Sequence, residues 1–135
     1  MKKLTMFALS IATIIFMVSA HINVKTVKAD SKVELFRTKA TAYCLTGKTA
    51  SGAYTTEGRT VASKPEWIGS TMIVWLDDGD GRIKDENYLG TYEVQDTGGE
   101  NVKNGKVIDI YNGCYEWCIN FGTKNVIVEV IKSEG

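Results

Sequence analysis

After residue 32 the apolar positions fall in short runs, in which β-branched and aromatic residues alternate with polar ones. Such runs, bounded by Gly, Pro, Asn and Asp, are typical of β-strands. We therefore predict strands at Val33–Ala42, Thr60–Ser63, Thr71–Leu76, Tyr88–Gln95, Lys106–Tyr111 and Asn125–Ile131.

The segments between these runs carry turn and loop signals. Thr46–Arg59 is rich in Gly, Ser and Thr and is predicted to form a long loop. Only Gly113–Asn120 has a helical pattern, with Gly122 as its expected stop. Short strands, glycine-rich connections and one short helix favour a mainly β fold, a compact β-barrel. A β-sandwich fits the same pattern.

The first 29 residues follow a different pattern. Lys2 and Lys3 precede an uncharged apolar run at residues 4–20, and Val27-Lys28-Ala29 offers the small-x-small pattern of a signal-peptidase site. We predict a signal peptide at residues 1–29 and an exported domain at residues 30–135. An uncleaved membrane anchor is the alternative, although the run is slightly shorter than the roughly 20 residues that span a bilayer. After cleavage we expect no stable membrane association.

Cleavage changes the charge and the available chemistry. It would remove four lysines and no acid, so 16 basic and 16 acidic residues become 12 and 16, a net charge of about minus 4. A mildly acidic chain without a basic stripe argues against nucleic acid as a partner. His21, the only histidine, also lies in the removed segment. Without histidine, Ser-His-Asp and Cys-His catalysis and mixed His/Cys zinc sites are excluded, and we predict no metal and no cofactor.

Two aspartates are the candidate acid/base groups. Asp109 lies between Ile108 and Ile110 within a predicted strand, where solvent should be scarce. Asp96 opens Asp96-Thr97-Gly98-Gly99, whose glycines permit close backbone approach. A turn cap and a salt-bridged strand aspartate would produce the same local pattern. The absence of histidine from the exported part favours an acid/base pair.

Several motifs, in order along nearly the whole exported part, are similar to those of the three-aspartate (3D) domain family. They are Thr41-Ala42-Tyr43-Cys44, Thr49-Ala50-Ser51-Gly52, Ile68-Gly69-Ser70, Gln95-Asp96-Thr97-Gly98-Gly99, Ile108-Asp109-Ile110-Tyr111 and Phe121-Gly122. The resemblance implies a six-stranded double-psi β-barrel. Relatives of that family include the C-terminal part of membrane-bound lytic transglycosylase A and the muralytic domains of stationary-phase and resuscitation-type proteins.

The resemblance also implies a function. It implies a secreted or cell-wall-associated enzyme that cleaves peptidoglycan glycan strands in the manner of a lytic transglycosylase and leaves a 1,6-anhydro product. Asp109 would be the catalytic acid/base and Asp96 the second catalytic carboxylate. Substrate-binding positions are expected at Thr41, Tyr43, Thr97 and Gly98. We expect the protein to act as a monomer.

One departure from the family pattern supports an alternative function. The first family aspartate falls on Lys64, which would place a cation near the expected site. The alternative is a non-catalytic barrel that binds wall glycans, with Tyr43, Tyr54 and Trp67 stacking on sugar faces. Core packing is the other interpretation of these three aromatic residues.

Three cysteines allow one disulfide in an exported domain. Cys114 and Cys118 are one helical turn apart, a spacing that strains a direct bond. A bond from Cys44 to either of them is compatible with the sequence. The family resemblance implies Cys44–Cys118, with Cys114 free or facing an external thiol.

Overall fold

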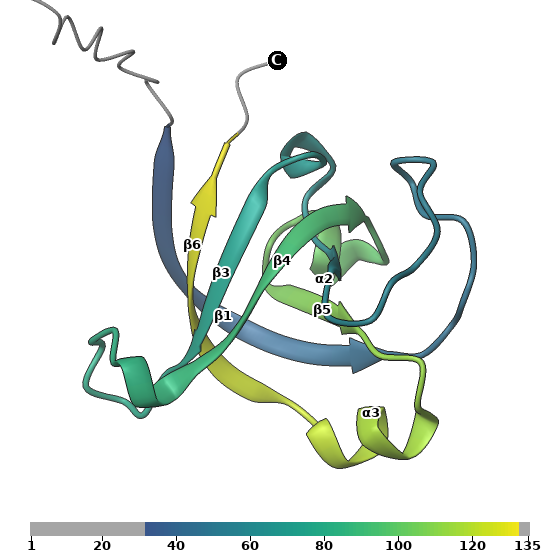
Figure 1. Ribbon diagram of the computed structural model, residues 1–135. Helices are drawn as coiled ribbons and strands as arrows, with labels where there is room; N and C mark the ends of the chain where they lie inside the picture. Colours follow the sequence, from purple (N-terminus) through teal and green to yellow (C-terminus); the bar gives the residue numbers. More distant parts are fainter. Residues whose placement is uncertain (1–31, 133–135) are drawn as a thin grey trace, which may run out of the picture. The chain divides into compact units, whose positions relative to one another are not determined.

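The computed structural model describes residues 32–132, which form a closed barrel of six strands (Figure 1). The predicted signal peptide lies outside the described residues. The strands are β1 (Val33–Tyr43), β2 (Thr60–Ala62), β3 (Thr71–Leu76), β4 (Tyr88–Asp96), β5 (Val107–Tyr111) and β6 (Lys124–Ile131). The six strand predictions are confirmed, and their ends differ by at most one residue.

Around the barrel the strands follow the order β1-β5-β2-β4-β3-β6 and then return to β1. The pairs β1/β5 and β2/β4 are parallel, and the other four pairs are antiparallel. The predicted mainly β, six-stranded double-psi barrel is confirmed, and the sandwich alternative is wrong. Closure leaves no strand edge exposed in the barrel wall.

Strand β1 is long and pairs with two neighbours. Its first part runs antiparallel to β6, with Val33 opposite Ile131, and its last part runs parallel to β5, with Thr41 opposite Asp109. Ala40, which is fully buried, lies where both pairings meet. The end of β1 therefore lies against β5, where the sequence placed the candidate carboxylates.

The barrel interior is filled by alternate residues of the strands. Besides Ala40, the fully buried apolar side chains are Val61, Met72, Val74, Val94, Ile108, Val126, Val128 and Val130, with Ile110 only 1% exposed. Trp67 joins this core at 3% exposure, and its ring centroid lies 5.1 Å from that of Phe36. The hypothesis that Trp67 stacks on sugars is therefore wrong, because its ring is used in packing the core.

Two α-helices connect strands. Helix α3 (Tyr115–Phe121) begins two residues later than predicted and stops at Gly122, whose φ of 62° suits glycine. The single-turn α2 (Glu100–Lys103) was not predicted and buries only Val102. Two 3-10 turns cover Pro65–Trp67 and Asp85–Asn87. Within residues 32–132 no helix is both long and apolar enough to cross a bilayer.

Candidate active site

Two carboxylates lie in one row across adjacent strands. Thr41 of β1 is opposite Asp109 of β5, Asp109 is opposite Ala62 of β2, and Ala62 is opposite Asp96 of β4. Neighbouring strands are about 4.8 Å apart, so the two aspartate Cα atoms are roughly 10 Å apart. Only the methyl group of Ala62 stands between them in this row.

Asp109 points out of the barrel, because its neighbours Ile108 and Ile110 fill the core. The Thr41 hydroxyl donates a hydrogen bond to Asp109 Oδ1 at 2.9 Å. Burial raises the pKa of the Asp109 carboxyl, and the charge of Asp96 adds to the rise, whereas the Thr41 hydrogen bond opposes it. This environment favours a protonated carboxyl, as a general acid requires.

Asp96 ends β4 and is held by three donors. The backbone N–H groups of Ala50 and Thr97 donate to Oδ1 at 3.1 and 2.9 Å, and the Tyr43 hydroxyl donates to Oδ2 at 3.2 Å. Burial and the Asp96 charge raise the pKa of Tyr43 well above its ordinary value, so its hydroxyl keeps its proton. The Tyr43 ring packs edge-on against Tyr111, with centroids 5.4 Å apart.

The long loop between β1 and β2 is hydrogen-bonded to the end of β4. Besides the Ala50 contact, Ser51 N–H donates to the Gln95 carbonyl at 2.9 Å. Gln95 is itself fixed, since its side-chain oxygen accepts from the buried Thr60 hydroxyl at 2.7 Å. The role of Ala50 was not predicted, because a backbone donor leaves no signature in the side-chain sequence.

The four expected substrate-binding residues are in different situations. Thr41 and Tyr43 are hydrogen-bonded to the two carboxylates and so hold them in position. Gly98 lies so near Val102 that a Cβ there would come within 3.1 Å of its side chain. The Thr97 hydroxyl is buried and, among the described residues, has no hydrogen-bond partner.

Lys64 is directed away from the carboxylates. Its ammonium group lies 4.5 Å from the centroid of the Trp67 ring. It borders a cavity that Glu34 and Phe36 also line. The influences on the pKa of Asp109 come from burial, Thr41 and Asp96. Lys64 therefore does not place its charge beside Asp109, as the sequence had led us to expect. Its neighbour Ser63 remains near Asp96, because the Ser63 N–H bonds the Asp96 carbonyl at 3.0 Å.

Cys44, Cys114 and Cys118 are free thiols in the structure, so the predicted Cys44–Cys118 bond is not formed there. Burial raises the pKa of Cys118, and Cys44 is the next cause of the rise, which places the two thiols within electrostatic range. The disulfide stays a prediction.

If that bond forms on oxidation, closing the long loop from Cys44 to Cys118 should stabilise the domain by roughly 3–5 kcal/mol. Peptide mapping without reductant, together with urea unfolding before and after reduction, would measure both parts. A Cys44–Cys114 link, or an oxidised protein in which Cys44 is unlinked, would contradict the prediction.

The raised pKa of Asp109 predicts a pH-dependent stability difference. A carboxyl whose pKa rises on folding stabilises the fold fully below its ordinary pKa of 3.8 and loses that contribution as the pH rises through the folded-state value. Asp109→Asn should therefore be more stable than the wild type at neutral pH, and the difference should shrink in acid. Urea unfolding at about pH 3 and about pH 7 tests this. An equal difference at the two pH values would show that folding does not raise this pKa.

Comparison with known proteins gives one kind of match. No family model matches the chain, and no curated protein matches it. A crystal structure of the lytic transglycosylase MltA from E. coli is similar at 26% identity, with a TM-score of 0.47 over 65% of this chain and 28% of that one. An apo form of an MltA variant gives 25% identity and a TM-score of 0.48, over 66% of this chain. The chain thus spans about 28% of the length of these proteins.

Proposed function

We propose that this chain is a peptidoglycan-lytic enzyme that cleaves glycan strands with Asp109 as its acid/base. The observation that carries the proposal is the environment of Asp109. Its carboxyl is half-buried on the outer wall of the barrel, is oriented by Thr41, and has a raised pKa. A general acid for glycoside cleavage needs these properties, because it must hold a proton before the reaction begins.

The proposed reaction needs no nucleophile from the protein and no activated water. The Asp109 carboxyl gives its proton to the glycosidic oxygen as the C1–O bond breaks, and the leaving sugar departs as an alcohol. The resulting carboxylate takes the proton from the C6 hydroxyl of the sugar that keeps C1, and the oxygen of that hydroxyl bonds to C1. The product is a 1,6-anhydro ring, and Asp109 recovers its proton.

Asp96 and Tyr43 support this chemistry from the neighbouring strands. The negative charge of Asp96 contributes to the raised pKa of Asp109. It also favours the positive charge that develops on the sugar ring as the bond breaks. Three hydrogen bonds fix the position of Asp96, and Tyr43 supplies one of them. Tyr43 is therefore a positioning residue in this proposal.

The alternative is a barrel that binds wall glycans without cleaving them, and of the three aromatic residues named for it only Tyr54 is exposed. The Tyr54 side chain is 71% exposed on the loop before β2 and is free to stack on a sugar. Trp67 is buried, and the Tyr43 ring is packed against Tyr111. These contacts favour the enzyme over the binding module.

Incubating the exported protein with purified peptidoglycan tests the proposal, with the released fragments identified by mass. We expect fragments that end in 1,6-anhydro sugars. Fragments with free reducing ends would indicate a hydrolase. Co-sedimentation with the wall without any release would favour the binding module. We also propose that the protein is secreted or associated with the cell wall, and its recovery from the culture medium or the wall fraction tests this.

A further inference from the structure

Two cavities meet at Gly105, two residues before β5. The first, of about 390 Å³, is lined by Glu34, Leu35, Phe36, Lys64 and Trp67. The second, of about 410 Å³, is lined chiefly by Arg37, Thr38, Lys39, Asp77 and Lys106. Gly105 borders both, and we call them the Gly105 cavities. Gly105 has a φ of +78°, and a Cβ there would collide with Lys64 Cε, so a side chain would obstruct the point where the cavities meet.

The charged side chains of the Gly105 cavities that form no ion pair are positive. Glu34 is paired with Lys132 at 2.7 Å, and Asp77 accepts a hydrogen bond from Arg37 Nε at 2.6 Å. Both acids are therefore neutralised by neighbouring cations. Lys39, Lys64 and Lys106 form no ion pair with any carboxylate of residues 32–132. Three unpaired cations thus surround Gly105 in a chain expected to be net negative after cleavage.

One of these cations, Lys39 of the second cavity, lies near the candidate active site. Lys39 precedes Thr41 by two residues in β1, so both side chains point to the outer face of the barrel. Lys39 is opposite Val107 just as Thr41 is opposite Asp109. Two residues of a strand span about 7 Å, which is the offset between Lys39 and the row that contains Asp109. A branched polymer seated on Asp109 can therefore reach the second cavity with a short side branch.

A cation–π contact with an aromatic ring orients the Lys64 ammonium group. This group lies 4.5 Å from the centroid of the Trp67 ring, whose other contacts fix it in the core. A cation–π contact orients an ammonium group and leaves donors free for a ligand. Neutral sugar hydroxyls need no such cation, whereas a carboxylate gains from several.

We propose that the Gly105 cavities bind the carboxylates of the peptide branches carried by the glycan strand, with Lys39, Lys64 and Lys106 as the binding cations. This inference rests on the proposed function, because it takes the same polymer as the ligand. It adds a requirement that the acid/base chemistry does not contain. The enzyme binds glycan that carries its peptides more tightly than it binds bare glycan.

Binding to two glycan preparations tests the inference with the exported full chain. One preparation keeps its peptides, the other has them removed by an amidase, and both are first freed of phosphate-containing polymers. We expect Lys39→Gln/Lys106→Gln to weaken binding to the peptide-bearing glycan by ~3- to 10-fold, as two partly exposed ion pairs would. Its binding to bare glycan should equal that of the wild type.

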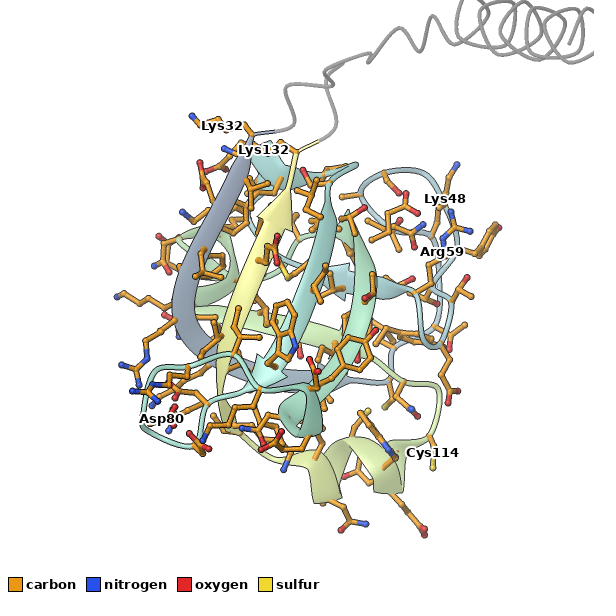
Figure 2. All side chains as sticks on the ribbon, turned by 60° about the vertical axis from the view of Figure 1, so that its left-hand side comes forward. Lys32, Lys48, Arg59, Asp80, Cys114 and Lys132 are labelled. Carbon is orange, nitrogen blue, oxygen red and sulfur yellow. The ribbon has the colours of Figure 1, made fainter. Side chains whose placement is uncertain are left out.

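Lys48→Gln/Arg82→Gln is the matched control, since it removes the same charge at two exposed residues outside both cavities. Lys48 lies on the loop after β1, and Arg82 on the hairpin loop that carries Asp80 (Figure 2). The control should bind both glycans like the wild type. An equal loss with both double variants would overturn the inference, because net charge alone would then explain it.

Two other results would also overturn the inference. Equal loss on bare glycan would mean that the lysines do not contact peptide carboxylates. A loss seen only on wall that keeps its phosphate polymers would assign the cavities to phosphate. Fragment release is scored separately from binding. If glycan is cleaved but binding ignores the lysines, only this inference fails. If peptide-dependent binding is found without cleavage, only the proposed enzyme fails.

Discussion

Asp109→Asn should lower the rate of glycan cleavage by ~10²–10⁴-fold, the usual contribution of a general acid/base. Asparagine keeps the shape of the side chain and can still accept the Thr41 hydrogen bond, which is 2.9 Å long in the wild type. It has no proton to give to a glycosidic oxygen and cannot take one back. Initial rates of 1,6-anhydro product release measure the effect, and circular dichroism checks that the barrel is intact.

Asp96→Asn is the comparison for this prediction. It should lose less activity, because Asp96 acts on Asp109 through its charge and is not the proton donor. Removing that charge lowers the pKa of Asp109, so the fall of activity with rising pH should begin at a lower pH. Wild-type protein that cleaves glycan, together with an Asp109→Asn variant that cleaves it equally well, would refute the mechanism.

Trp67→Ala should lower the free energy of unfolding by ~3–5 kcal/mol, the usual cost of deleting a buried aromatic ring. Trp67 is 3% exposed, packs against Phe36, and supports the Lys64 ammonium group. Small domains are stable by only about 5–15 kcal/mol, so this loss would be a large fraction of the total. Urea unfolding followed by tryptophan fluorescence from Trp75 and Trp117 measures the loss.

Tyr54→Ala is the control, because Tyr54 is 71% exposed. Its unfolding free energy should change by no more than about 0.5 kcal/mol. A Trp67→Ala variant as stable as the wild type but defective in wall binding would contradict the packing argument. It would return Trp67 to a role in sugar binding.

The strands were predictable because each runs between clear turn signals and buries alternate residues. Met72, Val74, Val126, Val128 and Val130 follow this pattern and are fully buried. Helix α2 was missed, since one turn that buries a single valine carries no periodicity. For a related reason the sequence left Trp67 open between sugar binding and core packing. An aromatic residue in a short 3-10 turn has no strand pattern to show which way it faces.

For the candidate site, Asp96 and Asp109 were predicted from the sequence, but their arrangement on the two strands that flank β2 was not. Their row depends on Ala62, which pairs with both, and on a shift of register between Val61 and Ala62. A methyl group carries no chemical signal, and pairing between distant strands cannot be read from local pattern. The contact of Lys64 with the Trp67 ring was not predicted either, because no local pattern shows which way these two side chains point.

The position of β6 in the barrel also constrains how the chain folds. It pairs with β1 along one side and with β3 along the other, and Lys132 N–H bonds the Lys32 carbonyl at 3.2 Å, so the two ends of the described chain meet (Figure 2). The wall therefore stays open until residues 124–131 are available. A topology built on such distant pairings folds slowly, in milliseconds to seconds, compared with helical bundles. Until then β1 and β3 each lack a partner, and during that interval the unfinished barrel is exposed to aggregation and to proteases.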